Sequence, residues 1–388
     1  MQPLPMRILL AGAGSLLLIF LLIGFGGTNM SPLTLSRAPL DRAGNGGLLA
    51  DAGNTTLGFQ KIFVIDLPTR PDLRDSMSLA AALTPDGGLD IEYIDGVTEV
   101  LDNALPPGDK DKERKMRKGT VGAWRAHINA LRTIVERNIT SALIIEGDID
   151  WDLRIKTQMQ DFAKASRLLV QPGLEDNIFD ISDKPMVEPK TSPYGDTDLW
   201  DILWLGHCGT EMVDPEKNKA KIHTGRVVIS NDETVPEPQH VKIEYGTDQL
   251  VKQYPAHTRV VHRTRMNVCS LAYGVSQQGA RKFLYELGIR KLNEAMDLMM
   301  RAMCDGFGGR AQHNCLTVEP QLFQHYRPVG SKKTFSEIAE HGDGYNEVAF
   351  TRNIRWSTRL NFRKLVDGEK DYIDLFQDGQ PAQDLGFG

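Results

Sequence analysis

Short apolar runs alternate with amphipathic segments through the middle of the chain, and this alternation predicts an α/β fold. Buried parallel strands are continuous apolar runs, whereas amphipathic helices repeat their apolar positions every three or four residues. Strands are predicted at residues 61–67, 91–94, 142–145, 199–206, 269–275 and 316–318, and helices at 70–83, 120–135 and 154–169, with another starting after 276. Strand, helix and strand within residues 61–94 predict a βαβ unit and therefore a mostly parallel central sheet.

Two stripes of apolar residues mark the core faces of predicted helices. The stripes are Trp124, Ile128, Leu131 and Val135, and Met296, Met299, Met300 and Met303. Their spacings of three and four residues place each stripe on one helical face. Asp297 lies beside the methionine stripe in the first turn of its helix. An acid there can be a partner of the helix dipole, or a catalytic base if that end faces a ligand.

The segment 141–152 carries the strongest candidate chemistry. An apolar run, 142–145, is followed by four acids in seven residues: Glu146, Asp148, Asp150 and Asp152. Ligands of open α/β sheets bind beyond the carboxyl ends of the strands, and clustered carboxylates favour Mn²⁺ or Mg²⁺. The pair Asp148-x-Asp150 is therefore predicted to clamp a metal-bound diphosphate. The alternative is an ordinary solvated acidic turn.

Two other sites are excluded by spacing. An EF-hand starting at Asp148 would need glycine and glutamate where the chain has Leu153 and Met159. A serine hydrolase would need G-x-S-x-G, and the segment 274–279 is one residue too long. Residues 171–198 are predicted to be a loop, and residues 209–262 an insertion over one face of the sheet.

The N-terminal segment determines the expected compartment. Residues 8–25 are uncharged and long enough to cross a bilayer, with Arg7 before them. We expect a short cytoplasmic tail at 1–7, a signal anchor at 8–25 and a flexible stem at 26–58. A cleaved signal peptide is the alternative, although its apolar core is usually shorter. Sequons at Asn54 and Asn138 agree with entry into the secretory pathway.

Charge and cysteine content narrow the function classes. The 388 residues carry a net charge of −6, so the chain has no general attraction to nucleic acid. Four cysteines allow three full pairings, between which the sequence does not choose. A Cys304–Cys315 disulfide is favoured over a zinc site with His313, because the spacing matches no standard zinc pattern and the expected compartment is oxidising.

Several blocks in the same order resemble glycosyltransferase family 25, the group of lipopolysaccharide glycosyltransferases and collagen β-galactosyltransferases. The resemblance covers roughly residues 61–331. The blocks are Val64-Ile65-Asp66-Leu67 with Arg70 and Arg74, Asp95-Gly96, Gly122-Ala123-Trp124-Arg125-Ala126-His127, Leu143-Ile144-Ile145-Glu146-Gly147-Asp148, Asp201-Ile202-Leu203-Trp204-Leu205-Gly206, Ala272-Tyr273-Gly274-Val275-Ser276 with Gly279-Ala280, and Asp297. Gly147 replaces the first Asp of the family's E-D-D, and Ala123 and Ala126 replace its Cys and Ser.

The resemblance implies a GT-A-like, Rossmann-type nucleotide-sugar-binding domain, at 59–335. A C-terminal extension at 336–366 and an acidic, disordered tail at 367–388 would follow it. It implies transfer of a hexose, galactose or glucose, from a UDP-sugar to a glycan or glycoprotein acceptor, with inversion and with Mn²⁺ or Mg²⁺. The expected setting is the Golgi or endoplasmic reticulum membrane, with the catalytic domain in the lumen.

Roles for individual residues follow from the same resemblance. Asp297 is the expected catalytic base and Glu146 the second candidate. Arg70, Arg74 and His127 are expected to bind the donor, and Asp148 and Asp150 the metal. The alternative is a catalytically inactive, membrane-anchored relative that binds nucleotide-sugars or glycans. Gly147 favours that alternative, whereas the intact Asp148-x-Asp150 pair opposes it.

Overall fold

The computed structural model describes residues 47–108, 116–174, 176–213, 223–339 and 341–382. These residues belong to one unit, Gly46–Gly388. The predicted cytoplasmic tail and signal anchor, and the stem as far as residue 46, lie outside the described residues. Within the described ranges, no helix combines the length and the apolar character that a membrane span requires.

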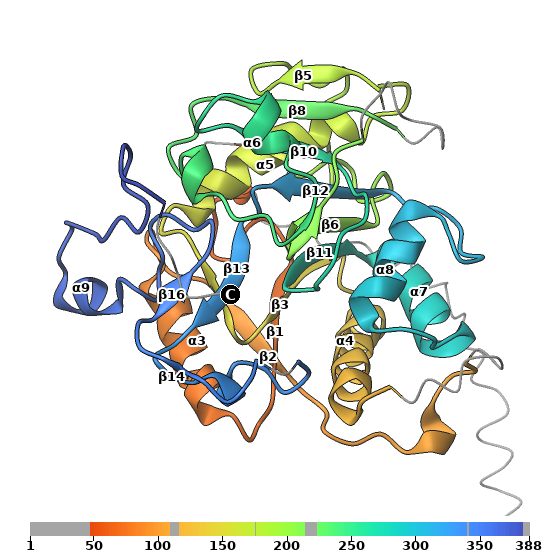
Figure 1. Cartoon of the computed structure of the whole chain (residues 1–388). Coiled ribbons are helices and arrows are strands. Elements are labelled where there is room, and N and C mark those ends of the chain that lie inside the picture. The colour runs from red at the N-terminus through yellow and green to blue at the C-terminus, as the bar shows by residue number, and fades with distance from the viewer. Residues whose placement is uncertain (1–46, 109–115, 175, 214–222, 340, 383–388) are drawn as a thin grey trace, which may run out of the picture. The chain divides into compact units, whose positions relative to one another are not determined.

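A central sheet organises the unit (Figure 1). Along its main path the strands follow the order β2 (Ile91–Asp95), β1 (Lys61–Asp66), β3 (Ser141–Glu146), β11 (Ala272–Ser276), β6 (Ile202–Gly206), β12 (Cys315–Glu319), β10 (Arg259–Arg263), β8 (Arg226–Ile229) and β5 (Ile178–Asp180). Seven of these nine strands point the same way, and only β11 and β10 are reversed. These strand directions confirm the predicted α/β fold with a mostly parallel sheet.

Helices cover both faces of the sheet. The residues of β3 alternate between two apolar clusters: Leu143 and Ile145 face the cluster that includes α3 (Pro71–Leu83) and α5 (Ile155–Leu169). Ala142 and Ile144 face the cluster of α4 (Lys118–Glu136), α7 (Gln277–Tyr285) and α8 (Met296–Asp305). A strand buried on both faces reads as a continuous apolar run, which is why the sequence located β3 accurately.

The predicted core faces of the two helices are confirmed. All four methionines of the α8 stripe are buried, and Trp124, Ile128 and Leu131 of α4 are buried with Val135 at the margin. Ser276 caps α7 by accepting a hydrogen bond from the backbone N–H of Gly279 at 3.1 Å. Cys304 and Cys315 form the expected disulfide, and Cys208 and Cys269 form a second one.

Three sequence predictions about organisation are corrected. Residues 47–58 are packed rather than flexible, because α2 (Gly47–Asp51) leads to the fully buried Ala52 and Leu57. The insertion at 209–262 does not merely cover a face, because β8 and β10 extend the sheet itself. The loop at 171–198 supplies β5, the last strand of the path.

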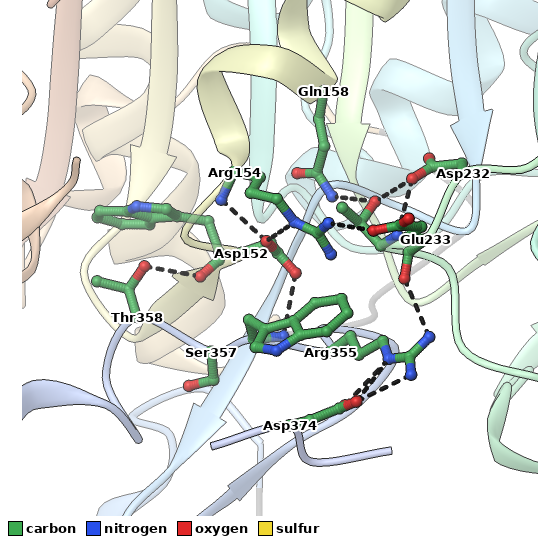
Figure 2. A network of polar contacts seen from close by, with 12 residues as sticks. Asp152, Arg154, Gln158, Asp232, Glu233, Arg355, Ser357, Thr358 and Asp374 are labelled. Atoms are coloured by element: carbon green, nitrogen blue, oxygen red, sulfur yellow. Dashed lines mark hydrogen bonds and ion pairs between the residues drawn. The ribbon is translucent and has the colours of Figure 1, made fainter. Parts of the chain in front are cut away.

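The described part of the C-terminal segment, residues 367–382, packs against the rest of the unit, so the predicted disorder is wrong for these residues. Phe376 is 1% exposed. Figure 2 shows why the segment is held: Arg355 forms a bidentate pair with Asp374, with contacts of 2.8–3.0 Å, and donates to the carbonyl of Glu233 at 3.1 Å. Asp152 accepts from the backbone N–H of Trp356 at 3.0 Å. The charges that made the tail look solvated are largely paired.

Strand β13 (Phe323–Arg327) lies off the main path and carries the chain back over the carboxyl edge of the sheet. It pairs antiparallel with β4 (Ile149–Trp151) and β16 (Phe350–Thr351) and meets β6 at Gly206. Other short α-helices and strands are α6 (Gln249–Gln253), α9 (Phe362–Asp367), the pair β7 (Gly209–Thr210) with β9 (Tyr245–Gly246), and the pair β14 (Gly330–Ser331) with β15 (Tyr345–Asn346). Through β13, residues far along the chain reach the acidic segment.

Glu319 at the end of β12 makes the stability of this fold pH-dependent. The residue is 5% exposed, and its Oε2 has no hydrogen-bond partner among the described residues. Burial raises the pKa of Glu319 from 4.5 to about 8. Since the folded chain holds this proton more tightly than the unfolded chain, stability falls as pH rises through that interval and levels off above it.

The substitution Glu319→Gln removes this titration. We expect it to raise the free energy of unfolding by about 2–4 kcal/mol at pH 9 and to leave it unchanged at pH 4. Urea unfolding of both proteins at the two pH values measures the difference. An equal gain at pH 4 and pH 9 would mean that packing, not ionisation, is responsible.

Candidate active site

The acidic segment lies where several parallel strands end. Strands β1, β3 and β6 point the same way, so Asp66, Glu146 and Gly206 end at one edge of the sheet. Gly147 and Asp148 form the turn between β3 and β4. Strand β13 pairs with β4 so that His325 lies opposite Ile149, and the backbone N–H of Tyr326 donates to the carbonyl of Asp148 at 2.8 Å. The edge therefore gathers polar groups from distant parts of the sequence.

Glu146, Asp148 and His325 form a group that can hold a metal ion. One ligand atom from each lies within 4.8 Å of the others. Burial lowers the pKa of His325, which keeps its imidazole neutral, as metal ligation requires. Burial alone would raise the pKa of Asp148, but its interactions with His325, Arg327 and Arg359 lower it overall. A carboxylate pair with a neutral imidazole is a donor set that Mn²⁺ accepts.

Asp150 is not part of this group, so the structure does not bring together the predicted Asp148-x-Asp150 clamp. Its carboxylate is 0% exposed and is turned toward the C-terminal segment. It accepts hydrogen bonds from the Ser357 hydroxyl, the Trp151 N–H at 2.9 Å and the Arg359 N–H at 3.2 Å. Asp148 precedes β4 in the turn, whereas Asp150 lies within the strand, and therefore the two carboxylates serve different neighbours.

We expect Asp150→Ala to destabilise the protein without removing the metal group. The substitution leaves three buried donors unsatisfied, and each such loss costs about 1–3 kcal/mol in isolation. With partial relaxation, the free energy of unfolding should fall by about 2–4 kcal/mol. Chemical denaturation measures the loss. A variant with unchanged stability but weakened metal binding would return Asp150 to the metal site.

Glu146 is held by a buried polar network. The Ser270 hydroxyl donates to Glu146 Oε1 at 2.8 Å, and His127 Nε2 lies 3.5 Å from the same oxygen. His127 is 2% exposed, and its Nδ1 meets the Tyr273 hydroxyl at 3.0 Å. Ser270 and His127 therefore orient the carboxylate of Glu146, and Tyr273 fixes the ring of His127.

Two neighbouring pockets share the acidic turn as a common wall. The β1 pocket, about 330 Å³, is lined by the end of β1, the start of α3, residues 96–98, the first turns of α4 and residues 335–338. The α8 pocket, about 360 Å³, is lined by the start of α8, the Cys208 and Cys269 region, β13 and residues 244–245. Both include Glu146 and Asp148. A group transferred between molecules in the two pockets would pass these carboxylates.

The predicted catalytic and donor residues divide between these pockets. Asp297 lines the α8 pocket at the first turn of α8, where its Oδ2 accepts from the backbone N–H of Cys269 at 2.8 Å. Arg70 and His127 line the β1 pocket. Arg70 is paired with Asp72 and with Glu337, each at 2.7 Å. Glu146 lies between the two groups.

Arg74 does not share this placement. Its guanidinium pairs with Asp95 at 2.5 Å, donates to the carbonyl of Asp66 at 3.2 Å and lies 5.0 Å from the centre of the Tyr93 ring. It is absent from the lining of the two pockets in the described part of the chain. These contacts tie the ends of β1 and β2 together, so the structure gives Arg74 a supporting position behind the β1 pocket.

Gly147 is required by its neighbour. A Cβ atom at this position would lie 2.7 Å from Cγ and 2.9 Å from Oδ2 of Asp66. Asp66 is 6% exposed and lines the β1 pocket, and its burial raises its pKa to about 6. The carboxylate of Asp66 therefore fills the space beside Gly147 where a side chain at 147 would stand. The position of Gly147 therefore still has a carboxylate beside it, supplied by Asp66.

Sequence reasoning missed several residues of this edge. They are His325 and Arg327 of β13, Ser270, Asp66 and the Cys208–Cys269 disulfide. Arg327 pairs with Asp148 at 3.0 Å across 179 positions of sequence. The sequence Phe-Gln-His-Tyr-Arg of β13 has no alternation of apolar and polar residues, and Gln324 and Arg327 are buried along with Phe323, so this strand carries no clear local signal. Both sequon asparagines are exposed, and their glycosylation remains a prediction.

The known proteins with similar sequences include galactosyltransferases and an inactive relative of them. No protein-family model matches the chain. The chain is 25% identical over 176 residues to procollagen galactosyltransferase 1 of Danio rerio, covering 43% of this chain and 25% of that protein. It is 26% identical over 172 residues to inactive glycosyltransferase 25 family member 3 of Homo sapiens, covering 42% and 24%. It is 22% identical over 169 residues to procollagen galactosyltransferase 2 of Homo sapiens, covering 42% and 23%. The chain spans about a quarter of the length of these relatives.

Proposed function

We propose that this chain, a relative of glycosyltransferase family 25, transfers a hexose from a UDP-sugar to a glycan or glycoprotein acceptor. One observation supports the proposal most directly: the carboxylates of Glu146 and Asp148 form the wall shared by two pockets. A donor in one pocket and an acceptor in the other would meet at that wall. Galactose and glucose are the first donor sugars to test.

The β1 pocket suits the nucleotide diphosphate. The first turns of α4, including Gly119 and Gly122, line it. The amino end of a helix carries partial positive charge and unpaired N–H groups, which favour phosphate. Arg70 adds a guanidinium whose present partners, Asp72 and Glu337, are carboxylates. An anionic phosphate can take the place of Glu337 at this guanidinium.

Glu146, Asp148 and His325 are the residues that would hold a divalent cation. When bound there, the cation would supply positive charge to offset the charge that develops on the departing diphosphate. His127 and Ser270 fix the carboxylate of Glu146, and Arg327 fixes that of Asp148. The chain thus orients the cation's ligands from both sides.

Asp297, which lines the α8 pocket, would act as the base. Its carboxylate would take the proton of an acceptor hydroxyl while that oxygen attacks the anomeric carbon. The bond between the anomeric carbon and the diphosphate oxygen breaks in the same step, and UDP leaves. Attack from the side opposite the leaving group inverts the anomeric centre. Asp297 is held for this by the N–H of Cys269.

Two disulfides support a setting in the secretory pathway, because such bonds persist in oxidising compartments. We therefore propose a Golgi or endoplasmic reticulum location with a lumenal catalytic domain. The signal anchor at 8–25 stays a prediction from the sequence.

The first test is UDP release by the full chain with UDP-galactose, UDP-glucose and related donors, each with Mn²⁺ and with EDTA. Metal-dependent release with one donor supports the transferase. The alternative is an inactive binding relative, which the inactive family member among the similar proteins keeps open. Saturable UDP binding without release from any donor, across an acceptor panel of hexosides and glycopeptides, would favour that alternative.

A further inference from the structure

Tyr245 presents an exposed aromatic ring at the α8 pocket. The residue is 60% exposed, yet it lines the same pocket as Asp297 and His325. It lies in the short strand β9, which pairs with β7 of the segment that follows β6. An aromatic side chain exposed at a pocket offers the face of its ring to a molecule that enters the pocket.

The backbone of Tyr245 is fixed by two glycines. A Cβ at Gly209 would lie 2.0 Å from the carbonyl oxygen of Tyr245, so only glycine allows the two strands to approach this closely. Gly246 has a φ of +96°, and a Cβ there would lie 1.9 Å from the carbonyl oxygen of Thr210. The ring is therefore carried by a strand whose position is set by close backbone packing.

The same local structure connects Tyr245 to the proposed base. The N–H of Tyr245 donates to the carbonyl of Cys208 at 3.3 Å, Cys208 is bonded to Cys269, and the N–H of Cys269 holds Asp297. A short covalent and hydrogen-bonded path thus joins the backbone of Tyr245 to the carboxylate of Asp297. A molecule resting on the ring would present its atoms to Asp297 in a defined position.

The chemistry around Tyr245 matches a sugar ring. A pyranose has a face of C–H bonds, which carry partial positive charge, and the face of an aromatic ring is negative. The rim of a pyranose carries hydroxyls that both donate and accept hydrogen bonds. The ion pair of Glu244 and Arg352 lines the same pocket and offers both kinds of partner.

We propose that Tyr245 is the stacking platform for a pyranose of the acceptor, so that the acceptor of this chain is a glycan. The inference rests on the proposed transferase function and narrows its substrate class. It favours a sugar over a polypeptide because the exposed aromatic face and the charged pair complement a ring with an apolar face and a hydroxyl rim.

The test compares Tyr245→Ala with Tyr245→Phe in the full chain. The matched control is Tyr345→Ala, since Tyr345 is 59% exposed on an equally short strand and does not line the α8 pocket. The probes are methyl β-D-galactopyranoside and methyl β-D-glucopyranoside. Loss of the ring should raise the KM for the accepted hexoside by about tenfold, and Tyr245→Phe should retain most of the affinity. The KM for the UDP-sugar should stay the same.

A binding measurement keeps the inference separate from the proposed activity. Saturation-transfer NMR with the hexosides and UDP should show contact with the pyranose C–H groups in the unsubstituted protein and in Tyr345→Ala, and a much weaker signal in Tyr245→Ala. Equal signals in all three proteins would overturn the platform, whether or not UDP is released. Turnover of a hydroxyl-bearing peptide but of no hexoside would overturn the glycan acceptor. Hexoside contact without UDP release would instead reject the transferase and leave a glycan-binding site.

Discussion

Replacing Asp297 with asparagine should reduce hexose transfer by about 10²–10⁴-fold, the usual contribution of a positioned general base. The reason is chemical rather than structural. The asparagine Oδ1 can still accept the N–H of Cys269, which Asp297 Oδ2 accepts at 2.8 Å, so α8 should keep its position. What the variant loses is a carboxylate able to take the acceptor proton. Initial rates at saturating donor and acceptor measure the effect.

Asp305→Asn is the matched control for that experiment. Asp305 ends the same helix, and its Oδ2 accepts the N–H of Met266 at 2.9 Å, but it does not line the α8 pocket. We expect this variant to retain transfer. If Asp297→Asn kept full turnover in a folded, UDP-binding protein, Asp297 would not be the base, and Glu146 would be the next residue to test.

Replacing Asp148 with asparagine should remove both metal binding and metal-dependent UDP release. Asp148 contributes a charged oxygen to the group with Glu146 and His325, and a neutral amide is a weaker ligand for a hard cation. A metal that binds only the folded state at 100 times its Kd adds about 2.7 kcal/mol of stability. Titration with Mn²⁺ should therefore raise the Tm of the unsubstituted protein and leave that of Asp148→Asn almost unchanged.

Asp150→Asn is the control for this experiment, because Asp150 lies two residues from Asp148 but outside the metal group. In Asp150→Asn, the amide oxygen can still accept the backbone N–H groups of Trp151 and Arg359, and the amide nitrogen can donate to the Ser357 hydroxyl, so this variant should retain the metal response. Equal loss of the Mn²⁺ response in both variants would contradict the assignment of Asp148 alone. A normal Mn²⁺ response in Asp148→Asn would move the metal away from Glu146, Asp148 and His325.

The central part of the fold was predictable because its signals are local. Strand β3 is an unbroken apolar run, and the α4 and α8 stripes repeat at helical spacing, so each element is visible within a dozen residues. Strand β10 was not visible, because its sequence Arg-Val-Val-His-Arg mixes charged and apolar residues. Arg259 is nevertheless buried, since Asp232 at 2.7 Å and other partners compensate its charge. That compensation depends on contacts between separate elements.

In the candidate site, too, the residues that local signals mark were predicted and the others were missed. The position of Glu146 and Asp148 followed from the rule that chemistry lies beyond the carboxyl ends of parallel strands. The role of Asp150 did not, because it is decided by Ser357, which lies 207 positions away. His325 was missed because β13 is reached only after the chain has crossed the sheet. Spacing in the sequence indicates which acids are near each other, but not which way each side chain turns.

The Cys208–Cys269 bond has a practical consequence for studies of this chain. It holds together the strand of Tyr245 and the loop that carries the N–H bonded to Asp297, whereas the β1 pocket contains neither cysteine. A preparation from a reducing cytoplasm should therefore retain nucleotide binding while its acceptor side is loosened. Acceptors should therefore be screened with protein from an oxidising expression host. A reduced sample would lose acceptor binding because its disulfide is open, not because its sequence encodes an inactive protein.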